Sequence, residues 1–181
     1  ASSGDLQVGA AGEAGFGSIT SGALERSNID LTEEEITEGQ QIFLRRGLMQ
    51  YGSIVGHGAY LGPDYTAEYL RLSSENIREQ LTDAGVQDPS LATIEMLRTN
   101  RYDESTGELR FTPEQVVAFE AAKAYYADFF GTDSTRYGLI PEAITDPQDI
   151  HQLTAFFGWT GWAAAAERPG HDYSYTNNWP P

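Results

Sequence analysis

The chain of 181 residues carries 27 acidic and 11 basic side chains, which gives a formal net charge of -16. A surface this negative repels phosphate backbones, so the composition argues against nucleic acid as a partner. With Lys123 as the sole lysine, it favours a protein that stays soluble in high salt, where self-repulsion is screened; an ordinary acidic protein is the alternative. The absence of cysteine excludes disulfides, thiol nucleophiles and a covalently attached c-type haem.

The predicted domain organisation is one domain with a tail at each end. The length suits a single core, and no run of about eighteen apolar residues predicts a membrane span. Residues 1–28 are rich in Gly, Ser and Ala and lack a basic start, so we expect a flexible lead-in rather than a signal peptide. Residues 29–170 form the predicted domain, and residues 171–181 an extended aromatic segment.

Helix start and stop signals place the elements of the first half. Thr32 with Glu35 is a capping box that predicts a helix over 33–46, and Gly47 is its expected stop. A second helix is predicted from near Thr66 to Gly85, with a possible interruption at Ser73 and Ser74. A short third helix is expected over 91–98.

The second half predicts one small β-hairpin and two longer helices. The Asp, Ser, Thr and Gly residues within 101–111 indicate a tight turn between two short strands. A capping box of Thr112 and Gln115 starts a helix over 113–130. The last helix opens at Asp146 and ends before Pro169 and Gly170. The fold class is therefore mainly α.

The charged residues form no recognisable catalytic set. We interpret the acids of the first helix, Glu33, Glu34, Glu35 and Glu38, as solvated residues that suit the helix dipole. A carboxylate-based hydrolase would need two positioned acids, and no such pair can be identified. Asp64 is expected to cap the second helix or turn the chain before it.

The histidines and the terminal aromatic residues are the other candidates. His57, His151 and His171 share no metal-ligand spacing, and His151 is expected at the surface. His57 lies between glycines, so its ring serves either a contact or the packing of its own loop. Large aromatics near a chain end mark an interface or a segment that folds back on its own domain; the residues concerned are Tyr173, Tyr175 and Trp179.

Two long blocks carry a resemblance to a known family. The stretches EGQQIFLRRGLMQYGSIVGHGAYLGPDYTAEYL (38–70) and FFGWTGWAAAAERPGHDYSYTNNWPP (156–181) resemble the hydrophilic N-terminal region of quinol-dependent nitric oxide reductases. The resemblance implies a cytochrome c-like helical domain without haem on the extracytoplasmic face of the membrane. It also implies a transmembrane part of the same polypeptide that holds haem b and a haem and non-haem iron centre, where two NO are reduced to N2O.

The resemblance also identifies a lost haem motif. In the cytochrome c-dependent relatives, a C-x-x-C-H motif precedes the sequence G-E-G-A-Y-Y-A-P-E. Aligning that sequence with residues 56–64 places the haem motif over Leu48, Met49, Gln50, Tyr51 and Gly52. Neither thiol nor ligating histidine is present, so the resemblance implies that apolar and aromatic side chains fill the space. Tyr51, Trp159, Trp162 and the phenylalanines are the candidates.

Through the resemblance, the retained loop implies a calcium site and a contact with the transmembrane part. In the relatives, backbone carbonyls of the G-A-Y element contribute to a calcium site between subunits. Carried over to this sequence, the ligands are the carbonyls of Gly58 and Tyr60, while His57 replaces a glutamate. Because Ca²⁺ needs six to eight ligands, the remaining ligands would come from the transmembrane part. The loop residues His57 and Ala59 are expected at that interface, together with the terminal aromatics.

Two hypotheses of function follow. In the first, the chain is a non-catalytic docking domain of a membrane-bound nitric oxide reductase, with its GHGAY loop and terminal aromatics against the transmembrane part. In the second, it is an independent haemless binding module that presents an aromatic patch to a soluble protein. Under the first hypothesis the isolated domain exposes apolar surface, so we expect it to self-associate.

Overall fold

Helices dominate the fold, as the capping signals predict. The computed structural model describes residues 30–132 and 134–176. The helices in this part of the chain are α1 (Glu33–Arg45), α2 (Tyr65–Asp83), α3 (Pro89–Arg98), α4 (Pro113–Phe130) and α5 (Pro147–Ala165). Two 3₁₀ turns, η1 (Leu48–Gln50) and η2 (Ser134–Tyr137), follow α1 and α4. The predicted mainly α class is confirmed.

Local capping explains where the helices begin. Thr32 accepts from the N–H of Glu35 and Glu35 accepts from the N–H of Thr32, which confirms the first capping box. Thr112 and Gln115 form the second box in the same way. Gly47 follows α1 in the left-handed conformation, with φ of 63°. The expected break in α2 does not occur, because Ser73 is buried and the Ser74 hydroxyl bonds back to a helix carbonyl.

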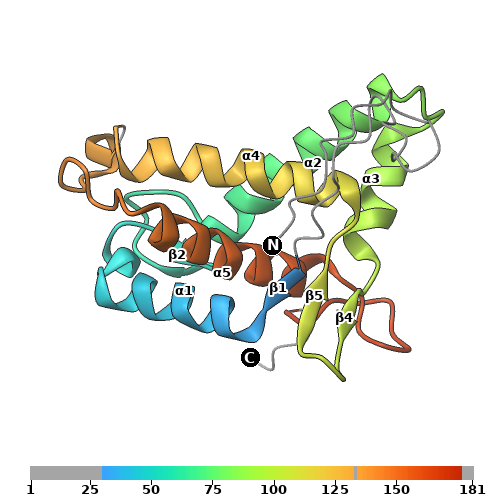
Figure 1. The fold of residues 1–181 in the computed structure, drawn as a ribbon, viewed down its shortest axis with the longest axis horizontal. Coiled ribbons are helices and arrows are strands. Elements are labelled where there is room, and N and C mark those ends of the chain that lie inside the picture. Colours follow the sequence, from blue (N-terminus) through green and yellow to red (C-terminus); the bar gives the residue numbers. More distant parts are fainter. Residues whose placement is uncertain (1–29, 133, 177–181) are drawn as a thin grey trace, which may run out of the picture.

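The helices pack around α5. In Figure 1, α5 runs between α1 and α4, and it also contacts α2. The approach of α1 to α5 is close at Gly39, where a Cβ atom would lie 2.0 Å from the carbonyl oxygen of Gln152. Only glycine fits this position without moving a helix. The core therefore rests on backbone contact as well as on side chains.

The β-structure is more extensive than the one predicted hairpin. Strands β4 (Tyr102–Asp103) and β5 (Glu108–Arg110) form that hairpin, and β1 (Asp30–Thr32) adds to it as an antiparallel edge. Leu31 and Tyr102 both pair with Leu109. A second, unpredicted pair, β2 (Ser53–Ile54) and β3 (His57–Gly58), lies in the glycine-rich loop. This pair shapes the candidate site.

Candidate docking face

The glycine-rich loop 52–64 is fixed to the domain by one carboxylate. Asp64 caps α2 by accepting from the N–H of Ala67 at 2.9 Å, which confirms its predicted role. Its other oxygen accepts from the Ser53 hydroxyl at 2.8 Å and from the Gly56 N–H at 2.7 Å. Because one side chain satisfies three donors, the loop and the start of α2 hold each other in place.

Backbone contacts then set the shape of the loop. Ser53 pairs with Gly58, and Ala59 donates its N–H to the Met49 carbonyl at 2.9 Å. Gly58 has φ of 143°, and a Cβ atom there would lie 2.3 Å from the Gly52 oxygen. The loop thus needs glycine at this position both for conformation and for close approach.

The tip of the loop presents apolar side chains to solvent. Tyr60 is 87% and Leu61 67% exposed, whereas Ala59 is half-buried. The exposed ring of His57 donates from Nδ1 to the Val55 carbonyl at 2.9 Å, since a carbonyl can only accept. The tip is therefore an ordered projection of aromatic and aliphatic groups.

The residues aligned with the lost haem motif do not fit a haem. Leu48 is 1% exposed and packs in the core, while Met49 and Gln50 point to solvent. Tyr51 is half-buried against the core, and Gly52 has no side chain that could ligate iron. With no thiol in the chain and glycine at the position of the ligating histidine, neither covalent attachment nor histidine ligation is available to this motif.

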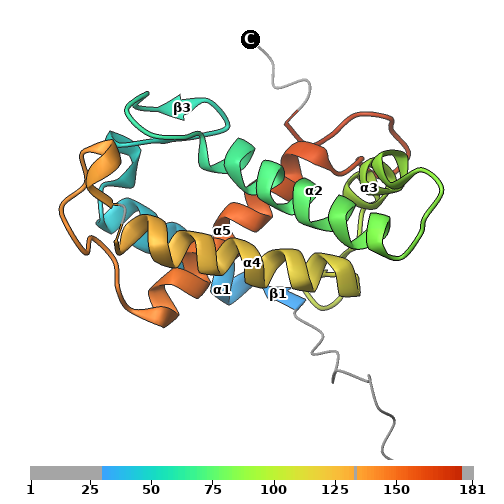
Figure 2. The same ribbon diagram turned by 90° about the horizontal axis from the view of Figure 1, so that it is seen from above.

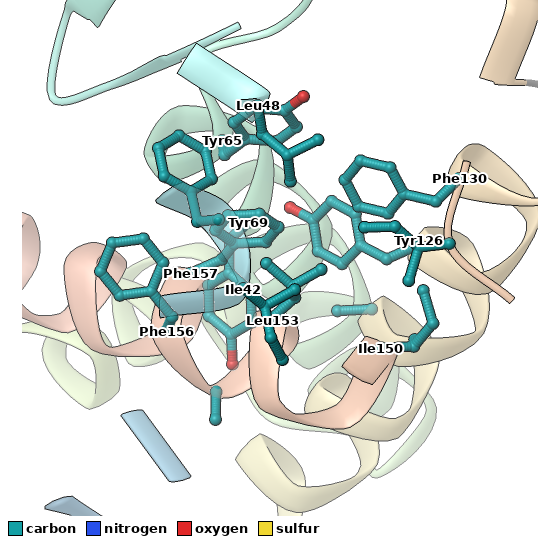
Figure 3. Close-up of a cluster of buried hydrophobic side chains, with 14 of the residues drawn as sticks. Ile42, Leu48, Tyr65, Tyr69, Tyr126, Phe130, Ile150, Leu153, Phe156 and Phe157 are labelled. Atoms are coloured by element: carbon teal, nitrogen blue, oxygen red, sulfur yellow. The ribbon is translucent and has the colours of Figure 1, made fainter. Parts of the chain in front are cut away.

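Aromatic side chains fill the space beneath Leu48. Tyr65 is fully buried and stacks on Phe157, with ring centroids 4.7 Å apart. Figure 3 shows these two with Tyr126 and Phe130 converging on one cluster. Burial raises the pKa of Tyr65 and Tyr126 far above the ordinary tyrosine value, so both rings stay neutral.

The two tryptophans expected in this space are half-buried and pack against the edge of the core. Trp159 and Trp162 pack on each other and make ring contacts with Tyr102 and Tyr175. The sequence alone does not show which of these rings pack together, because rings from distant segments meet only where they contact α5. The expectation that Trp159 and Trp162 help to fill the haem space stays a prediction, and the phenylalanines Phe130 and Phe157 pack on Tyr65.

The terminal segment folds back on the domain as far as it is described. The ring of Tyr175 lies 4.8 Å from that of Trp162, and its hydroxyl accepts from the Asn100 side chain. Arg168 donates to the Tyr175 carbonyl at 2.6 Å. Tyr173 is half-buried and stacks on His171. Trp179 lies outside the described residues, as do residues 1–28.

One histidine pairs with one acid, Glu35. Nε2 of His151 lies 3.2 Å from Glu35 and its ring meets Phe119 edge-on, so His151 is partly buried rather than a simple surface residue. Burial raises the pKa of Glu35, but hydrogen bonds from Thr32 and the contact with His151 outweigh it and lower the pKa overall. Within residues 30–132 and 134–176, no group of three His, Cys, Asp or Glu could hold a metal.

Two stretches of the chain lack acidic residues. Residues 39–63 and 150–166 contain no Asp or Glu, although the chain as a whole is strongly acidic. These two stretches meet around a groove lined mainly by apolar side chains, with Leu44, Met49 and Val55 exposed on it. Figure 2 shows the β2–β3 loop and the red segment after α5 on the same side, away from α4.

The groove and the neighbouring loop tip carry no acidic side chain, and no sequence motif marks the groove. We name this surface the docking face and define it by the loop tip (Tyr60 and Leu61) and by the groove residues Leu44, Met49 and Val55. The sequence contained only an indirect indication, namely the two long stretches without Asp or Glu. In the described part of the chain, no helix has the length and hydropathy needed to cross a bilayer.

The comparison with known families agrees with the fold. A family model for the cytochrome c-like domain of the nitric oxide reductase protein NorB matches residues 25–181. No curated protein sequence matches the chain. The family match spans every helix and strand of the structure. The chain belongs to the family of NorB cytochrome c-like domains of nitric oxide reductases.

Proposed function

We propose that this chain is the extracytoplasmic, non-catalytic docking domain of a membrane-bound, quinol-dependent nitric oxide reductase. The observation that carries the proposal is the docking face: an acid-free, apolar surface on a chain with a net charge of -16. Solvent-exposed faces of acidic proteins have no reason to avoid carboxylates, whereas the core of a protein interface is depleted of charge. The partner is the transmembrane part of the same polypeptide.

In this proposal the chemistry takes place outside the domain. Two NO molecules are reduced to N2O and water at haem and non-haem iron in the transmembrane part, and haem b in that part receives the electrons. The domain itself has no cysteine for c-type attachment, and Leu48, Tyr65 and Phe157 fill its centre. Quinol therefore delivers electrons directly to the transmembrane part, without a relay through this domain.

The loop supplies a contact and, in this proposal, part of a calcium site. The carbonyls of Gly58 and Tyr60 lie on an ordered and exposed loop, held by Asp64 and by the bond from Ala59 to Met49. Ca²⁺ takes backbone oxygens but requires further ligands, which the transmembrane part would provide. Ala59 and His57 lie beside these carbonyls and belong to the same contact.

A test of docking compares matched charge insertions in the complete membrane protein. One variant carries Tyr60→Asp with Leu61→Asp, and the control carries Leu91→Asp with Val117→Asp, at positions that are 51% and 48% exposed elsewhere on the domain. We expect a several-fold loss of quinol-driven NO consumption and faster proteolytic cleavage of the domain for the first variant alone, because a carboxylate buried in an apolar contact is desolvated without a partner.

The result that would overturn the proposal is equal activity and equal protease resistance in both variants. The second hypothesis, a module for a soluble partner, would then stand, with the docking face as its binding surface. On its own, the isolated chain is expected to consume no NO and to self-associate through the docking face. High salt should strengthen the association by screening the acidic surface, which also suits the saline habitat that the composition favours.

A further inference from the structure

A second pocket, with aromatic walls, lies between α1, the β4–β5 hairpin and α5. Its volume is about 250 Å³, below the roughly 300–1,000 Å³ of sites for drug-sized ligands, so it suits a small molecule. Figure 1 shows the hairpin next to the start of α1, where strand β1 pairs with β5. Three rings line the pocket, those of Tyr102, Phe156 and Trp159. The other lining residues are Glu33, Ile36, Thr37, Gln40 and Gly107.

Two of the rings are set at an angle to each other. The ring centroids of Tyr102 and Trp159 are 5.4 Å apart, and the ring planes are inclined by 69°. Trp159 also packs on Trp162, with centroids 4.6 Å apart, and Tyr102 pairs with Leu109 in the hairpin, so other contacts hold both rings in place. The face of an aromatic ring attracts cations. Two inclined rings can therefore contact one cation from two sides.

The pocket also contains a carboxylate that lacks a cationic partner. Oε2 of Glu33 lies over the hairpin turn, where a Cβ atom on Gly107 would be 3.7 Å from it. Within residues 30–132 and 134–176, no Lys, Arg or His forms an ion pair with Glu33. In the same hairpin, by contrast, Asp103 pairs with Arg110 at 2.7 Å. No basic side chain of the described residues lines the pocket either, so the pocket carries a negative charge beside its rings.

We propose that this pocket binds a quaternary ammonium group, with its methyl groups against Tyr102 and Trp159 and its charge balanced by Glu33. Ca²⁺ requires six to eight oxygen ligands, whereas the pocket offers one carboxylate and mostly apolar walls. A quaternary ammonium has no N–H donor that the rings would leave unpaired, and aromatic cages recognise it. The group belongs either to a free solute or to a lipid headgroup, because the pocket shares Gln40 and Phe156 with the groove of the docking face. Binding here is independent of the proposed function.

Calorimetric titration of the 181-residue chain with choline at low ionic strength tests the proposal. The matched ligand is the uncharged isostere of choline in which a tert-butyl group replaces the trimethylammonium group. We expect saturable binding of one choline per chain and about tenfold weaker binding of the isostere, because the isostere lacks both the attraction to the rings and the pairing with Glu33. Co-sedimentation with phosphatidylcholine vesicles that free choline reverses would identify a lipid headgroup as the source, and its absence would leave a free solute.

Variants locate the bound group. Glu33→Gln should weaken choline binding by about threefold or more, whereas Glu34→Gln removes an exposed neighbouring acid that does not line the pocket and should leave binding unchanged. Trp159→Leu should abolish binding, with its folding checked by circular dichroism. Equal binding of choline and its isostere to the wild type would overturn the proposal. So would equal weakening by Glu33→Gln and Glu34→Gln, because choline would then respond only to the net charge of the chain.

Discussion

Tyr60 and Tyr65 lie five residues apart and occupy opposite environments. Tyr60 is 87% exposed at the tip of a loop, while Tyr65 is 0% exposed and stacks on Phe157. Asp64 separates them, since its carboxylate caps the helix that carries Tyr65 and holds the loop that carries Tyr60. Tyrosine therefore stabilises the core at position 65, whereas at position 60 it is available for contact with a partner.

The contrast shows how side chains fill the centre of this cytochrome c-like fold. A haem is a large apolar group at the centre of such a domain, and its loss removes buried contacts that side chains must restore. In the proposed haemless domain, the aromatic cluster around Tyr65 would supply such contacts. The loop, by contrast, keeps apolar residues where they contribute nothing to the core, which is expected of a surface that a partner covers.

The largest expected effect is in the aromatic core. Phe157→Ala removes a buried ring that packs on Phe43, Tyr65 and Tyr126, and we expect it to lower the free energy of unfolding by about 3–5 kcal/mol. Tyr60→Ala should change it by less than about 0.5 kcal/mol, because the exposed ring makes few contacts. Urea denaturation of both variants checks the pair, and similar losses would contradict the contrast.

The anchor should have the next largest effect. Asp64→Ala removes the helix cap and leaves the Ser53 hydroxyl and the Gly56 N–H without their acceptor, at an expected cost of about 1–3 kcal/mol. The control Asp88→Ala removes only the cap of α3 and should cost about 1 kcal/mol. Faster amide exchange at Gly56 is expected in Asp64→Ala alone; unchanged exchange would show that the loop is held by other contacts.

Glu35 should give a pH-dependent effect of intermediate size. Glu35→Gln weakens the capping box and the contact with His151, with an expected cost of about 1 kcal/mol at neutral pH. Since the folded-state pKa of Glu35 is lowered, its contribution is complete above the unfolded pKa, about 4.3. It declines as the pH falls through the lower folded pKa. Denaturation at several pH values measures the decline, and a constant difference between wild type and variant would contradict it.

The smallest expected effect is that of the buried hydroxyl at Tyr65. Within the described residues this hydroxyl has no hydrogen-bond partner, and an unpaired buried hydroxyl is costly. Tyr65→Phe keeps the stacking on Phe157, so the free energy of unfolding should be unchanged or raised by up to about 1 kcal/mol. Thermal and urea denaturation check it, and a loss above that size would indicate a partner for the hydroxyl.

Elements that depend on a few consecutive residues could be predicted from the sequence, whereas contacts between distant segments could not. The capping boxes at Thr32 and Thr112 place their helices because each box lies within four consecutive residues. The edge strand β1 pairs with β5 nearly eighty residues away, and no local pattern announces such a pairing. Similarly, the loop motif was recognisable, whereas the groove arises only where α1 and α5 meet.

The most direct test of the docking proposal uses the absence of cysteine in this chain. A single thiol is introduced by Tyr60→Cys or, as the control, by Val117→Cys on α4, where the native side chain is 48% exposed. Labelling rates are compared between the isolated chain and the complete protein in membranes, with the labelled peptide identified by mass. Docking predicts that labelling at position 60 slows by about tenfold or more in the complete protein, since an interface core excludes solvent, while labelling at position 117 is unchanged. Equal rates at position 60 in the two forms would contradict the account.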